Sequence, residues 1–164
     1  MKPENAPAIL FVCLGNICRS PTAESVFRAK VDALKLETPF TIDSAGILGV
    51  HEGALADARM RRHATQRGYH LESKSRQVTV ADFDHFDYIV GMDKQNYRDL
   101  IARAPSAEAK KKVSLLLSYA PELSRSEVPD PYYGGEAGFE DVLDLIEQAC
   151  DPLLQHILTA QHRK

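Results

Sequence analysis

The sequence predicts a single α/β domain, residues 1–164, in which helices cover both faces of a four-stranded parallel sheet. Short apolar runs of strand length alternate with longer segments of helical periodicity, which is the pattern of a doubly wound sandwich. The first apolar run ends in a polar loop that leads directly into a helix, as at the ligand-binding edge of open parallel sheets. Neither a composition shift nor a low-complexity linker divides the chain.

The first strand and the first helix frame this loop. Residues 8–12 form an unbroken apolar run, as expected for a strand that is buried on both faces. After the loop, Pro21 suits the first turn of a helix, Ser20 is a good N-cap, and Glu24 stands near the acid position of a capping box. Apolar side chains then follow helical spacing to about Leu34.

The later elements are predicted from the same two periodicities. The predicted strands are residues 40–42, 88–90 and 113–117, the last running into a short turn or helix. The predicted helices are residues 57–67, 94–102 and 138–160. Residues 121–138 are rich in proline, glycine and acids, which predicts a long functional loop. With right-handed crossovers, a strand order of 2-1-3-4 places the first strand and its loop centrally.

Composition indicates an ordinary soluble protein, with 44% hydrophobic and 26% charged residues. A net charge of −3 argues against nucleic acid as the main partner. No apolar stretch reaches the roughly 18 residues of a membrane span, and the N-terminus lacks the apolar segment of a signal peptide. Three cysteines do not resemble a secreted disulfide framework, so we expect a cytoplasmic location. The six histidines show no ligand spacing, so no metal is expected.

Residues 13–21, here called the anion-binding loop, place a thiol, a guanidinium and a helix start in one turn. Unpaired N–H groups and the dipole of the helix favour an anion there. Arg19 is suited to hold two oxygens of a tetrahedral oxyanion, and the same positive field favours the thiolate form of Cys13. Ser20 is expected to donate a hydrogen bond to that sulfur. The glycines and the Gly-Lys-Ser/Thr ending of a nucleotide-binding loop are missing.

These residues resemble the signature of the low-molecular-weight protein tyrosine phosphatases. The resemblance continues over nearly the whole chain, through residues 43–46, 75–78, 86–90, 92–93 and 130–133. It implies a phosphotyrosine phosphatase that needs no cofactor and works through a cysteinyl-phosphate intermediate. In that role Cys13 is the nucleophile, Arg19 holds the phosphate and Asp130 is the general acid and base.

The resemblance implies roles for further residues. The expected phosphate-binding positions are Leu14, Gly15, Asn16, Ile17, Cys18 and Ser20. Tyr132 and Tyr133 match an aromatic wall that stacks on the substrate ring, although adjacent tyrosines also serve as packing anchors. Ser44 is expected to support Asn16 by a hydrogen bond. Val50 stands near a place where the family commonly has an aromatic residue.

Some interpretations stay open at this point. Cys18 is either a buried small residue or a redox partner that traps oxidised Cys13 as a disulfide. The basic cluster of Arg59, Arg61, Arg62 and Arg67 is either a solvated helix face or a docking patch for acidic partners. Asp93 and Asn96 follow the third strand and are assigned no catalytic role.

Two alternative functions are compatible with the same loop. An arsenate reductase binds an anion of nearly the same shape, but its thiol relay would have only Cys150 left and Asp130 would have no purpose. A non-catalytic phosphate-binding module would need neither an activated thiol nor an acid. The phosphatase interpretation implies phosphotyrosine-containing proteins as partners, bacterial tyrosine kinases among them, and inorganic phosphate as the product. Bacterial relatives also include secreted effectors.

Overall fold

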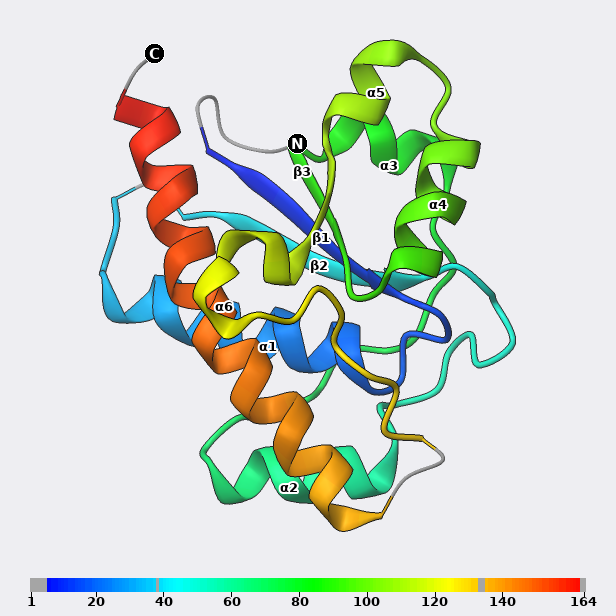
Figure 1. Cartoon of the computed structure of the whole chain (residues 1–164), viewed down its shortest axis with the longest axis vertical. Coiled ribbons are helices and arrows are strands. Elements are labelled where there is room, and N and C mark those ends of the chain that lie inside the picture. The colour runs from blue at the N-terminus through cyan, green and yellow to red at the C-terminus, as the bar shows by residue number, and fades with distance from the viewer. Residues whose placement is uncertain (1–5, 38, 133–134, 163–164) are drawn as a thin grey trace.

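The computed structural model describes residues 6–37, 39–132 and 135–162, and its centre is a four-stranded sheet in the order β2-β1-β3-β4. All three strand pairings are parallel (Figure 1). The strands are β1 (Ala8–Cys13), β2 (Thr41–Gly46), β3 (Tyr88–Gly91) and β4 (Val113–Leu115). The predicted fold class and strand order are therefore confirmed.

Strand β1 is the centre of both cores because its side chains alternate between the two faces of the sheet. On one face, Ile9 and Phe11 pack with the helices α1 (Arg19–Ala33), α2 (Ala58–Gln66) and α6 (Glu136–His162). On the other face, Leu10 and Val12 pack with α3 (Val80–His85), α4 (Lys94–Arg103) and α5 (Ala107–Lys111). Figure 1 shows the two helical layers on either side of the sheet, with α6 crossing α1.

The start of α1 differs from the prediction. The helix begins at Arg19, so Ser20 lies in its first turn, and the N-cap is Cys18, whose side chain makes no capping hydrogen bond. The Ser20 hydroxyl is instead used by Cys13 and Asn16. The carboxylate of Glu24 accepts hydrogen bonds from Ser44 and Arg28, so it does not form a capping box. The prediction was wrong here because other side chains, from the anion-binding loop for Ser20 and from Ser44 and Arg28 for Glu24, take up the groups that would cap the helix.

Several short elements also refine the prediction. The fourth strand ends at Leu115 and continues as the 3-10 helix η1 (Leu116–Tyr119), and a second one, η2, covers Pro121–Leu123. Strand β2 extends to Gly46 because it pairs with β1 as far as Cys13. Helices α3 and α5 were not predicted, since six and five residues are too few to display helical periodicity.

The basic cluster on and after α2 contacts acidic side chains rather than only solvent. Arg62 lies 2.8 Å from Glu136, while Arg67 lies 2.7 Å from Glu140 and 2.9 Å from Asp144 on α6. Arg61 donates to the Ala56 carbonyl. These contacts attach α2 to α6, so the cluster serves mainly to join two helices of one layer.

Candidate active site

A pocket of about 250 Å³ lies where the anion-binding loop leaves the carboxyl end of β1. It brings together most of the residues that the sequence singled out, although they come from both ends of the chain. These residues are Cys13, Leu14, Gly15, Ile17, Cys18, Arg19, Asp130 and Tyr132. Leu48, Val50 and His51 complete the lining, and of these only Val50 was compared individually with the family pattern. Tyr133 lies outside the described residues.

The Cys13 sulfur lies at the base of this pocket and is 3.0 Å from the Ser20 hydroxyl. Asn16 donates a hydrogen bond to the same hydroxyl oxygen at 2.8 Å, which leaves the Ser20 proton available for the sulfur. A hydrogen bond of this kind stabilises a thiolate more than a thiol, because the sulfur then carries the negative charge. The arrangement therefore suits an ionised nucleophile.

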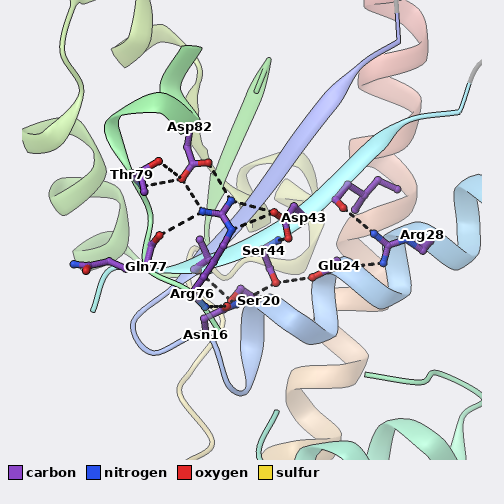
Figure 2. Close-up of polar contacts among 12 residues, drawn as sticks. Asn16, Ser20, Glu24, Arg28, Asp43, Ser44, Arg76, Gln77, Thr79 and Asp82 are labelled. Atoms are coloured by element: carbon purple, nitrogen blue, oxygen red, sulfur yellow. Dashed lines mark hydrogen bonds and ion pairs between the residues drawn. The ribbon is translucent and has the colours of Figure 1, made fainter. Parts of the chain in front are cut away.

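Asn16 stabilises the conformation of the anion-binding loop. Its backbone is left-handed, with φ of 58°, a conformation that asparagine tolerates better than most residues. Its side chain donates to Ser44 Oγ at 3.0 Å, the hydrogen bond expected from the family resemblance, and accepts from the Arg76 N–H at 3.1 Å (Figure 2). Ser44 in turn donates to Glu24 at 2.6 Å. Hydrogen bonds to Ser44 on β2 and to Arg76 therefore hold the anion-binding loop in place.

Gly46, at the end of β2, allows another part of the chain to approach this loop closely. A Cβ atom added there would lie 3.0 Å from the Leu14 carbonyl oxygen and 2.9 Å from that of Leu48. The close approach permits the hydrogen bond from the Leu48 N–H to the Leu14 carbonyl. The glycine therefore brings residues 47–51 to the side of the pocket.

The Arg19 guanidinium is buried, with 3% of its side chain exposed, and it is held by two acceptors. It donates to Asp93 at 2.6 Å and to the Val128 carbonyl at 3.1 Å. Burial acts to lower the pKa of Arg19, but the neighbouring Cys13 and the hydrogen bond to Asp93 outweigh it, so the pKa is raised. Arg19 thus provides a permanent positive charge at a fixed place beside the sulfur.

Sequence reasoning assigned no role to Asp93, which the structure places against Arg19. A signal was present, because Asp93 follows β3 and β3 pairs with β1, so both strands end at the same edge of the sheet. Asp93 also caps α4 by accepting from the Asn96 N–H at 2.8 Å. One carboxylate therefore orients both a helix and the arginine.

Asp130 lies at the edge of the pocket in residues 128–132, here called the acid loop. One carboxylate oxygen is 3.6 Å from Arg19, and the other accepts a hydrogen bond from the Tyr132 N–H at 3.0 Å. The side chain is 36% exposed, so it is open to exchange protons with water. Tyr132 and Val50 also line the pocket, and both side chains are exposed.

Cys18 lies in the same loop as Cys13, and both are free thiols in the structure. Burial, followed by the negative charges of Asp57 and Cys13, raises the pKa of the Cys18 thiol far above its ordinary value. Cys18 is therefore protonated at neutral pH in all but a small fraction of molecules, so it does not compete with Cys13 as the nucleophile of this pocket.

The described residues contain neither a metal site nor a helix that could span a membrane. Among residues 6–37, 39–132 and 135–162, no three histidine, cysteine or acidic side chains are grouped so that they could hold a metal ion. In the same part of the chain, every helix is too short or too polar to cross a membrane.

Comparisons with known proteins identify the family that this chain resembles. The family model for low molecular weight phosphotyrosine protein phosphatase matches residues 8–163. A putative low molecular weight protein-tyrosine-phosphatase from Synechocystis is 46% identical over 146 residues, covering 89% of this chain and 93% of that protein. The mouse low molecular weight phosphotyrosine protein phosphatase is 39% identical, covering 94% and 98%. A crystal structure of a protein tyrosine phosphatase from Entamoeba histolytica, with Hepes in its active site, has a TM-score of 0.91 at 44% identity and covers 95% and 99%.

Proposed function

The chain belongs to the low molecular weight phosphotyrosine protein phosphatase family, and we propose that it hydrolyses phosphotyrosine in proteins and small aryl phosphates through a phosphocysteine intermediate. The observation that carries this proposal is the meeting of a thiol, a guanidinium and a carboxyl group at one pocket, from Cys13, Arg19 and Asp130. The Hepes in the Entamoeba neighbour supports an anion site, because Hepes carries a sulfonate, a tetrahedral anion like phosphate.

In the first step, the Cys13 thiolate attacks phosphorus in line with the phenol oxygen. The sulfur–phosphorus bond forms while the bond from phosphorus to the phenol oxygen breaks, and Asp130 donates its proton to that oxygen. Arg19 and the N–H groups of the anion-binding loop hold the other three oxygens, over which the negative charge is spread. Because Asp93 and Val128 hold the guanidinium, it needs little reorganisation during the reaction.

In the second step, water attacks the phosphorus of the phosphocysteine. Asp130, now a carboxylate, takes a proton from this water, the sulfur–phosphorus bond breaks, and Cys13 returns to its thiolate form as inorganic phosphate leaves. The exposure of Asp130 suits this step, because the water must reach both the carboxylate and the phosphorus.

The walls of the pocket favour an aryl group over an aliphatic one. Leu14, Leu48, Val50 and Tyr132 provide apolar surface on which a phenyl ring is removed from water, whereas the short side chain of phosphoserine offers little area to bury. Val50 is 71% exposed, so most of its side chain is available to contact a substrate. The aromatic stacking in this enzyme then comes from Tyr132 and, by the family resemblance, Tyr133.

We also propose a cellular location and a protein substrate for the enzyme. A cytoplasmic location suits the enzyme, because a nucleophilic thiol works best in a reducing compartment. A bacterial tyrosine kinase that carries its own phosphotyrosine is the proposed protein substrate, since it presents the aryl phosphate that this pocket fits.

The function is tested by assaying phosphate release from a phosphotyrosyl peptide and from para-nitrophenyl phosphate at pH about 5 to 6. We expect turnover of both, competitive inhibition by inorganic phosphate, and little release from the matched phosphoserine peptide. Arsenate should inhibit without being reduced. Phosphate binding without turnover would instead indicate a binding module, and arsenite formation would indicate an arsenate reductase.

We also propose that Cys18 protects Cys13 from irreversible oxidation. Peroxide converts the Cys13 thiolate to a sulfenic acid, and the Cys18 thiolate then attacks that sulfur, forming a disulfide and releasing hydroxide. Because the pKa of Cys18 is raised by burial, its thiolate fraction is small at neutral pH and rises with pH. We therefore expect disulfide formation to accelerate by about tenfold per pH unit, and activity to return with a dithiol.

Mass spectrometry of the peroxide-treated protein checks this prediction. Wild-type protein should carry a Cys13–Cys18 disulfide, while Cys18→Ser should progress to sulfinic and sulfonic acid at Cys13 and stay inactive after reduction. Overoxidised Cys13 as the sole product of the wild type would show that Cys18 gives no protection.

A further inference from the structure

Arg59, in the first turn of α2, contacts the acid loop although it does not line the pocket. Its guanidinium carbon lies 5.4 Å from the centre of the Tyr132 ring and 4.9 Å from the centre of the Phe139 ring on α6. Its Nη2 also donates a hydrogen bond to the Tyr132 carbonyl at 3.1 Å. One side chain thus binds both the ring and the backbone of Tyr132 and connects them to α6.

Asp57 fixes the orientation of this guanidinium. The Arg59 Nε and Nη2 donate to the two carboxylate oxygens of Asp57 at 3.2 and 3.1 Å, a two-pronged contact that defines the plane of the group. Asp57 is itself the N-cap of α2, and its N–H donates to the Ile17 carbonyl at 2.7 Å. The start of α2 is therefore attached directly to the anion-binding loop.

These contacts form a continuous path from the anion-binding loop to Asp130. It runs from Ile17 through Asp57 and Arg59 to the Tyr132 carbonyl, and the Tyr132 N–H then donates to Asp130. Both polar groups of the Tyr132 backbone are thus used, one by Arg59 and one by the carboxylate. A shift of this backbone moves the Asp130 carboxylate relative to the Cys13 sulfur.

We propose that Arg59 is a positioning residue for the general acid, which sets the distance between Asp130 and the leaving oxygen through the Tyr132 backbone. The proposal rests on the role of Asp130 in the proposed function. Proton donation depends steeply on geometry, and a displacement of about 1 Å in a catalytic group costs on the order of 10²-fold in rate. Removal of Arg59 should therefore weaken the acid without changing the phosphate site.

The test compares Arg59→Met with Arg62→Gln, a control on the same helix whose partner Glu136 is largely exposed. The readout is kcat/KM for a series of aryl phosphates, because the phenol leaves in the step that kcat/KM reports. For Arg59→Met we expect a loss of about tenfold with phenyl phosphate, a poor leaving group, and a loss within about twofold with para-nitrophenyl phosphate. The inhibition constant of inorganic phosphate should stay within about twofold, and Arg62→Gln should match the wild type.

An equal loss for all leaving groups, or no loss, would overturn the proposal. Thermal unfolding establishes that each variant is folded at the assay temperature, and Arg59→Lys, which keeps the charge but not the planar two-pronged contact, takes the place of Arg59→Met if the latter does not fold. Asp130→Asn, assayed with the same aryl phosphates, distinguishes failure of the positioning role from failure of the role of Asp130. If the loss in Asp130→Asn does not depend on the leaving group, the proposed role of Asp130 as the acid fails; if it does and the loss in the Arg59 variants does not, only the positioning role of Arg59 fails.

Discussion

Replacing Cys13 with serine is expected to lower kcat by more than about 10³-fold while leaving the affinity for inorganic phosphate nearly unchanged. A serine hydroxyl keeps its proton at neutral pH, and Ser20 and Asn16, which stabilise a sulfur anion, are too weak as bases to remove it. Arg19 and the loop N–H groups are unaltered, so the anion still binds. Steady-state assays with para-nitrophenyl phosphate and calorimetric titration with phosphate measure the two quantities.

The matched control is Cys150→Ala, which removes a fully buried thiol in α6, away from the pocket. It should retain near wild-type activity, which shows that loss of a thiol alone is harmless. Residual turnover in Cys13→Ser above about a thousandth of the wild-type value would mean that another group is the nucleophile.

Replacing Asp130 with asparagine is expected to lower kcat/KM by roughly 10²- to 10⁴-fold for phosphotyrosine, the range typical of a positioned general acid. The loss should shrink for para-nitrophenyl phosphate, because its phenolate is stable enough to leave without a proton. The measurement is kcat/KM against the pKa of the leaving phenol for both proteins.

Asp93→Asn provides the comparison, because Asp93 contacts Nη1 of Arg19 whereas Asp130 lies near Nη2. Weakening the support of Arg19 should reduce kcat/KM similarly for every leaving group and should raise the inhibition constant of phosphate. Parallel plots for Asp130→Asn and the wild type would exclude Asp130 as the acid.

The parts of the fold that were predictable depend on long, regular patterns. β1 is apolar on both faces, and α1 and α6 repeat apolar residues over many turns, so their existence and the strand order followed from the sequence. The start of α1 was not predictable, because Ser20 looks like a cap until Cys13 and Asn16 are known to share its hydroxyl. The preference of Ser20 for an N-cap position is outweighed by hydrogen bonds that its hydroxyl makes only in the folded chain.

The residues of the site were also predictable only in part. Cys13 and Arg19 stand six residues apart, so their chemistry is readable from one stretch of sequence. The groups that hold Arg19 in place are distant in the sequence, since Asp93 and Val128 lie 74 and 109 residues from it. In the same way, Arg59 lies 73 residues from Tyr132, whose carbonyl it contacts. Acidic residues after strands and arginines on helices are too common to identify such partners before the chain is folded.

The central place of β1 also affects when activity appears during synthesis. Cys13 and Arg19 are synthesised before the start of α4, where Asp93 lies, and before the loop that carries Asp130, which follow roughly 75 to 110 residues later. An early nascent chain therefore holds a thiol with neither a fixed guanidinium nor a proton donor beside it. The enzyme is expected to gain its activity abruptly, once the acid loop has been made and β3 has docked against β1.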